Sequence, residues 1–237
     1  MDPSSRRMTG ISGIVFVVLT TAVFVLTGEG DFSQSDAQVR DFFVDSSRQD
    51  MAFAALVLLP IAMAALLWFV AGVRGLLRGG DGGGGGLPSA AALGGGVFAA
   101  TFLASSTVSN AVPAALAFTD NYVFAVGIAR LTLVLGLVLA TVALGGGAVL
   151  VAATSLAGQR TGLLPRWFAI SGYVVAVLCL FSLLLFAWPY ALFGLWILTF
   201  SIMLLRAPRT TGEAGLPDQR AEEAPRPKHA AEPGVGG

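Results

Sequence analysis

Three side chains able to do polar chemistry lie near one another in the sequence, beside long apolar runs: Asn110, Asp120 and Arg130. An amide requires several hydrogen-bond partners, and an ionisable group at membrane depth is by default a functional hypothesis. One hypothesis is that the three residues line a small polar vestibule at the outer end of a helix bundle. The favoured interpretation is structural: Arg130 reaches to the interface or forms an ion pair with Asp120.

Combinations typical of enzymes are missing from the apolar runs. These runs hold no paired carboxylates, no His/Glu metal set and no Ser-His-Asp combination. The only histidine, His229, lies in a polar C-terminal segment, and a single cysteine, Cys179, excludes an intrachain disulfide. We therefore expect no catalytic activity, no metal and no cofactor. Because the net charge is zero and the basic residues are scattered, we also expect no nucleic-acid partner.

The composition is typical of a protein whose surface faces lipid instead of water. Of the 237 residues, 55% are hydrophobic and only 12% are charged. A soluble domain carries about a quarter of charged residues, because its surface faces water. The chain is therefore predicted to be an all-α, polytopic transmembrane helical bundle.

Six apolar runs are predicted to cross the membrane. A helix rises about 1.5 Å per residue, so a hydrocarbon core of about 30 Å requires roughly 20 residues. The predicted spans are about 11–27, 51–73, 89–112, 132–157, 167–187 and 191–205, with a turn at Trp188-Pro189 between the last two. Residues 1–10 form a cytoplasmic N-terminus, and the polar segment 207–237 is predicted to be a disordered cytoplasmic tail.

The third and fourth apolar runs are longer than a simple span. Pro113 is predicted to kink or end the third helix, because proline removes a backbone donor and crowds the preceding turn. The segment after it, 111–121, either projects beyond the outer leaflet or re-enters the membrane. Projection is favoured, since a re-entrant segment needs a protein or water lining.

Basic residues predict the orientation. With both termini inside, the inner segments hold Arg6, Arg7, Arg74, Arg78, Arg160, Arg166, Arg206, Arg209, Arg220, Arg226 and Lys228. The outer segments hold only Arg40, Arg48 and Arg130, together with several aspartates. This distribution follows the positive-inside rule.

The segment between the first two spans predicts a short amphipathic outer helix. Ser35 and Gln38 fit a capping box, and Val39, Phe42 and Phe43 then fall on one helical face. Asp36 and Arg40 are spaced to pair at i, i+4. The helix is interpreted as a lid packed on the bundle, with a partner-binding element as the alternative.

Small residues at helical spacing predict close packing between the third and fourth helices. Such residues let two backbones approach each other. They are Ala92, Gly96, Ala100 and Ala104 on the third helix, and Gly136, Ala140, Thr141, Ala143, Gly145 and Gly147 on the fourth. Replacing Gly96 with leucine is predicted to disrupt the contact. The alternative is that the glycine runs make these helices easier to bend.

Several loose motifs carry a resemblance: the acidic segment DAQVRDFFVDSSRQD, the helix end LLWFVAGVRGLLR and the later TGLLPRW. Over about residues 8–206 the chain resembles six-span integral membrane proteins of actinobacteria, a family that brings no established activity. The resemblance implies a bacterial plasma-membrane location. The leading hypothesis is association with the lipid bilayer, a membrane-protein partner or a second copy of the chain. The alternative is a transporter or channel-like protein for a small uncharged or lipidic solute.

Overall fold

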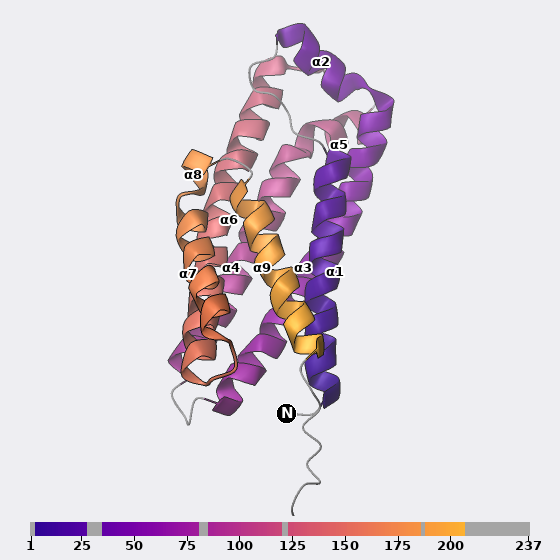
Figure 1. Ribbon diagram of the computed structural model, residues 1–237. Coiled ribbons are helices and arrows are strands. Elements are labelled where there is room, and N and C mark those ends of the chain that lie inside the picture. Colours follow the sequence, from indigo (N-terminus) through magenta and orange to yellow (C-terminus); the bar gives the residue numbers. More distant parts are fainter. Residues whose placement is uncertain (1–2, 28–34, 81–84, 120–122, 186–187, 207–237) are drawn as a thin grey trace, which may run out of the picture. The chain divides into compact units, whose positions relative to one another are not determined.

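Every regular element is an α-helix in the part of the chain that the computed structural model describes, residues 3–27, 35–80, 85–119, 123–185 and 188–206. In chain order the helices are α1 (Pro3–Thr27), α2 (Asp36–Val44), α3 (Ser46–Gly80), α4 (Gly86–Ser109), α5 (Ala111–Phe118), α6 (Val126–Arg160), α7 (Arg166–Leu180), α8 (Ser182–Leu185) and α9 (Trp188–Arg206) (Figure 1). The predicted all-α class is confirmed for these residues. The predicted tail, 207–237, lies outside them.

Five of these helices are long and apolar enough to cross a membrane: α1, α3, α4, α6 and α9. A helix suits that role because it satisfies its backbone hydrogen bonds within one segment. The chain is therefore a membrane protein with several long apolar helices. A shorter apolar helix, α7, has 15 residues, which is fewer than the roughly 20 that usually span a bilayer. The sixth span thus stays a prediction.

The last two apolar runs fold differently from the prediction. The helix expected over 167–187 breaks at Phe181, where α7 ends and the four-residue α8 follows. The Trp188-Pro189 pair, predicted as a turn between helices, forms the first turn of α9 instead. Proline is tolerated there because the first N–H groups of a helix have no intrahelical partner. With 19 residues, α9 is longer than the predicted span 191–205.

The third long run breaks at Asn110. α4 ends at Ser109, and the short helix α5 follows after this single residue. Pro113 explains the break, because its ring crowds the carbonyl group four residues earlier, which belongs to Ser109. The prediction that Pro113 ends the third helix is confirmed. Projection or re-entry of the following segment concerns its depth in a bilayer and stays a prediction.

The middle of the bundle is filled with aromatic rings. α1 packs on α3 and α9, and α4 packs on α3 and α6. At the centre, the ring of Phe98 lies 6.3 Å from Phe16, 5.4 Å from Phe102 and 4.7 Å from Phe193, measured between ring centroids. In lipid, burying apolar side chains between helices gives no hydrophobic gain, because the surrounding lipid is also apolar. Dispersion contacts in such packing stabilise the bundle instead.

The most extensive helix contact joins α4 to α6, the predicted pair. The two backbones come close where Gly94 faces Gly146. A Cβ atom at Gly94 would lie 2.7 Å from the carbonyl oxygen of Gly146 and 2.7 Å from the backbone nitrogen of Leu150. A Cβ atom at Gly146 would lie 2.7 Å from the backbone nitrogen of Phe98. Only glycine allows two backbones to come this close.

The predicted packing stripe on α4 requires correction. A Cβ atom at Gly96 would meet no heavy atom within 4 Å, and Ala100 and Ala104 are exposed. Small residues occur on every face of α4, so helical spacing alone does not select the face that touches α6. The face in contact is the one that carries Gly94 and Phe98.

On α6, some of the predicted packing residues lie in the contact with α4 and others lie outside it. Gly145 faces open space, and Ala140 is half-buried. Gly136 does lie in the contact: a Cβ atom there would meet the Ser109 hydroxyl and would lie 3.3 Å from the carbonyl oxygen of Ser105. Of the other predicted residues, Ala143 is buried, and a Cβ atom at Gly147 would lie 3.2 Å from Phe98 Cδ2. The α4–α6 contact therefore uses Gly136, Gly146 and Gly147.

The beginning of α1 lies beside the ends of α3 and α9. A Cβ atom at Gly10 would lie 2.8 Å from Leu205 Cγ, and one at Gly72 would meet the side chain of Thr9. Figure 1 shows α1 beginning where α9 ends. The arginines near this end, which we call the arginine end, include Arg6, Arg74 and Arg206, with Arg78 and Arg160 in the last turns of α3 and α6.

Candidate functional site

Arg130, a predicted site residue, forms an ion pair with the first residue of α2. Its Nη2 atom donates to Oδ1 of Asp36 at 2.7 Å. Asp120, the predicted partner from the nearby sequence, lies outside the described residues. The two paired residues are 94 positions apart, so spacing gave no signal for this contact.

A capping box places Asp36 for this pair. The Ser35 N–H donates to Gln38 Oε1 at 3.0 Å, and the Gln38 N–H donates to Ser35 Oγ at 3.5 Å. Both predicted halves of the box are present. The box starts α2 at Asp36, and the carboxylate of that residue pairs with Arg130. The predicted pair of Asp36 with Arg40 is not among the ion pairs of the described residues.

The apolar face of α2 packs on the helices beneath it. Val39 and Phe43 are buried in a cluster with Val112 of α5 and Ala129 of α6. The Phe43 ring lies 6.0 Å from that of Phe124. The side chain of Phe42 lies outside the described part of the chain. Because the two described apolar residues are used in packing, the structure favours the lid interpretation of α2.

Asn110 finds its partners within its own helix turn. Its Nδ2 atom donates to the carbonyl oxygen of Ser106 at 2.8 Å, and only 8% of the residue is exposed. Ser105 links two helices, because its hydroxyl donates to the Gly136 carbonyl oxygen at 2.7 Å. Ser105 therefore holds α4 against α6, whereas Asn110 and Arg130 bind different partners.

The lid is expected to depend on its apolar contacts more than on its ion pair. The side chains of Arg130 and Asp36 are 42% and 78% exposed, and an exposed pair contributes about 0–1 kcal/mol. Burying a phenylalanine such as Phe43 contributes roughly 1.5–3 kcal/mol. Phe43→Ala should therefore raise amide hydrogen exchange across 36–44 strongly, and Asp36→Asn only slightly.

Arg40→Gln, on the exposed face of α2, is the control for removing a charge and should leave the exchange unchanged. Equal exchange in Asp36→Asn and Phe43→Ala would contradict this expectation, because the ion pair would then contribute as much as the apolar contact.

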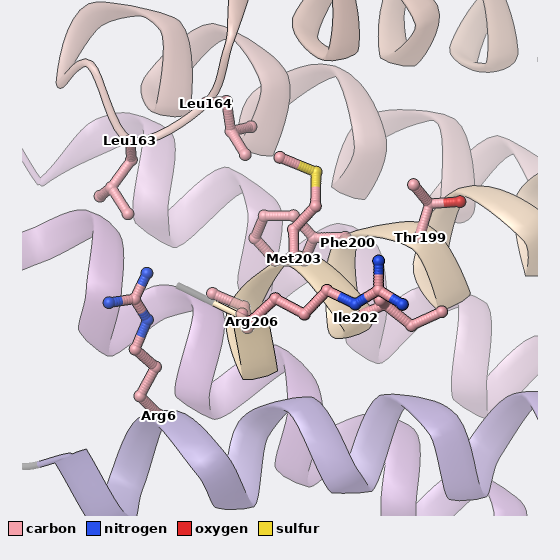
Figure 2. Close-up of a pocket in the computed structure, with 9 residues that line it drawn as sticks. Arg6, Leu163, Leu164, Thr199, Phe200, Ile202, Met203 and Arg206 are labelled. Atoms are coloured by element: carbon pink, nitrogen blue, oxygen red, sulfur yellow. The ribbon is translucent and has the colours of Figure 1, made fainter. Parts of the chain in front are cut away.

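A second candidate site, at the arginine end, was missed by sequence reasoning. A cavity of about 450 Å³ is lined by Arg6, Leu163, Leu164, Thr199, Phe200, Ile202, Met203, Leu204 and Arg206. Figure 2 shows Arg6 reaching in from α1, the two leucines on the α6–α7 loop, and Met203 and Arg206 on α9. The sequence signalled only the positive charge of this end, because the cavity is assembled from three separated segments.

Buried polar atoms between α6, α7 and α9 form a third feature. The hydroxyl of Ser155 and the indole N–H of Trp196 are buried, with no hydrogen-bond partner among the described residues. Both lie close to Gly172, where a Cβ atom would be 3.0 Å from Trp196 Nε1. The Ser201 hydroxyl on α9 is also buried and unpartnered within the described part of the chain, but it lies against Gly13 of α1. Burying a polar atom without a hydrogen-bond partner lowers the stability of the folded protein.

Comparisons with known proteins identify no family for this chain. The resemblance to six-span actinobacterial proteins stays a prediction. No family model, curated protein or solved structure matches the chain.

Proposed function

We propose that this chain is a six-span protein of a bacterial plasma membrane, with both termini in the cytoplasm. It acts by association with lipids or protein partners and catalyses no reaction. Six crossings are supported by the position of the helix ends. The start of α1 lies beside the end of α9, and termini on one side require an even number of crossings.

α7 supplies the sixth crossing in this proposal. Its 15 residues extend about 22 Å, and α8 continues the path after the break at Phe181. Tyr190, near the start of α9, lies at the end of α1 opposite to Arg6: its ring is 5.6 Å from that of Phe24. The chain therefore has to pass from the arginine end to the opposite end between α6 and α9.

The charges support the orientation. The arginine end carries Arg6, Arg74 and Arg206, whereas α2 and the start of α3 carry the exposed carboxylates of Asp36, Asp41 and Asp50. Basic residues beside spans stay on the cytoplasmic side. The arginine end is therefore the inner end, and α2 covers the outer end.

The aromatic packing around Phe98 is the observation that supports association over transport. Phe98 is 1% exposed and contacts rings from α1, α4 and α9. A solute pathway along these helices would have to displace those rings. At the outer end, the lid α2 covers α5 and α6 through Val39 and Phe43.

A transporter or channel-like activity is the second candidate. The observation that favours it is the pair of buried polar atoms without a partner among the described residues, the Ser155 hydroxyl and the Trp196 indole N–H. Water or a small solute between α6, α7 and α9 would satisfy them.

Single-cysteine labelling separates the two candidates. In a Cys179→Ala background, which removes the one native cysteine, the variants Asp41→Cys, Arg78→Cys and Ser155→Cys are treated with a membrane-impermeant maleimide. Cys at position 41 should react in intact cells, and Cys at position 78 only after permeabilisation. Cys at position 155 should stay unreacted in both, because a packed bundle excludes the reagent.

The same cysteine at position 41 then carries a photoreactive group for cross-linking in the membrane. A reproducible protein adduct, absent when the group is attached at position 78, supports association through the outer end. Rapid labelling at position 155 would contradict the packed bundle and favour transport. Labelling of positions 41 and 78 from the same side would contradict the six-span topology.

A further inference from the structure

The cavity at the arginine end combines two cations with apolar walls. Arg6 comes from α1 and Arg206 from the last turn of α9, while Leu164, Phe200 and Met203 supply apolar surface. None of the nine lining residues is acidic. The cavity therefore combines positive charge with apolar walls, and Figure 2 shows the Arg6 and Arg206 guanidinium groups apart from each other in this view.

One arginine of this cavity has an unused donor. The Nε atom of Arg6 is buried and has no hydrogen-bond partner among the described residues. An arginine that only extends into water would keep this N–H hydrated, and a buried donor left unpaired is costly. The position of Arg6 thus suits an acceptor that enters from outside the chain.

We propose that this cavity binds the headgroup of an anionic phospholipid of the inner leaflet. Guanidinium groups bind phosphate oxygens through paired N–H donors. The leucine, phenylalanine and methionine side chains suit the glycerol region and the beginning of the acyl chains, which a free phosphate ion lacks. A volume of about 450 Å³ lies within the range of small-ligand sites.

This inference rests on the proposed function, because it takes the arginine end as the cytoplasmic end. Anionic lipids of that leaflet attract basic groups near the membrane surface, and basic pockets between helices hold their headgroups. Within the proposed association role, the inference names the lipid class and the residues that select it.

The test measures lipid retained by the full chain. The protein is purified in mild detergent, exchanged into mixed micelles of phosphatidylglycerol and phosphatidylcholine in equal amounts, and its bound lipid is counted by native mass spectrometry. The wild type should retain phosphatidylglycerol preferentially. Arg6→Gln and Arg206→Gln should each lower that preference roughly tenfold, because each removes charged hydrogen bonds to phosphate.

Arg78→Gln and Arg160→Gln are matched controls. Both arginines are exposed near the same end, and neither lines the cavity. Each control should keep the wild-type preference, and the melting temperature in detergent should be the same in all four variants. Arg6→Lys keeps the charge but loses the planar fork, so it should retain only part of the preference. If Arg6→Gln does not fold, Arg6→Lys and Arg206→Gln carry the test.

Three outcomes would overturn the proposal. Equal losses in the Arg78→Gln and Arg6→Gln variants would assign the preference to surface charge in general. Equal retention of both lipids by the wild type would show no selection. A photoreactive phenylalanine analogue replacing Met203 that cross-links to residues 207–237, or to another protein, would place a different occupant in the cavity. In each case, unchanged labelling at positions 41 and 78 would leave the proposed topology intact.

Discussion

Gly94→Ala is expected to lower the melting temperature of the protein in detergent, and Gly96→Ala is not. The added Cβ atom at Gly94 would lie 2.7 Å from two backbone atoms of α6. Backbone cannot turn aside as a side chain does, so α4 and α6 have to move apart, at a cost of about 1–3 kcal/mol. At Gly96 the same methyl group meets nothing within 4 Å.

The matched pair separates packing from helix propensity. Alanine favours a helix over glycine by about 1 kcal/mol, so Gly96→Ala should be neutral or slightly stabilising. The same contrast is available on α6, where Gly146 touches α4 and Gly145 is open. Equal melting temperatures for Gly94→Ala and Gly96→Ala would show that the close α4–α6 contact is absent in the membrane-extracted protein.

Phe98→Ala is expected to have the second large effect. Its ring is 1% exposed and packs against rings from three helices. In soluble proteins, removing such a ring costs about 3–5 kcal/mol through lost transfer energy and the cavity left behind. In a membrane the transfer part shrinks, because lipid also solvates the ring, but the lost dispersion contacts remain. Thermal unfolding in detergent should therefore show a clear loss of stability.

Phe181→Ala is the control for this substitution. Phe181 ends α7 and is 56% exposed, so its removal leaves no enclosed cavity and should change the melting temperature little. A similar loss in both variants would mean that the ring cluster around Phe98 does not stabilise the bundle. Unchanged stability of Phe98→Ala would also remove the main support for a packed interior without a solute pathway.

The two candidate sites differ in how far the sequence could predict them. Asn110 and Arg130 stand out because polar side chains are rare in apolar runs. The partner of Arg130, however, comes from α2, far along the chain, and only folding brings Asp36 to it. The cavity at the arginine end had no motif at all. Arg6 and Arg206 lie near opposite ends of the described chain, and they line one cavity because α1 and α9 pack side by side.

The sequence by itself determined the helical class, most of the long apolar helices and the capping box at Ser35. Each of these depends on local physics: apolar runs in lipid have to form helices, and a cap involves residues three positions apart. The helix break before Pro113 is local in the same sense.

Only the tertiary structure decided which faces meet. Small residues surround α4, so spacing was equally compatible with Gly94 and Gly96, and the prediction chose the wrong face. The correct choice depends on the rotation of α4 against α6, which is set by the whole set of contacts, including Phe98 with Phe16 and Phe193. Side-chain type describes each residue alone, whereas packing depends on the distance between two backbones.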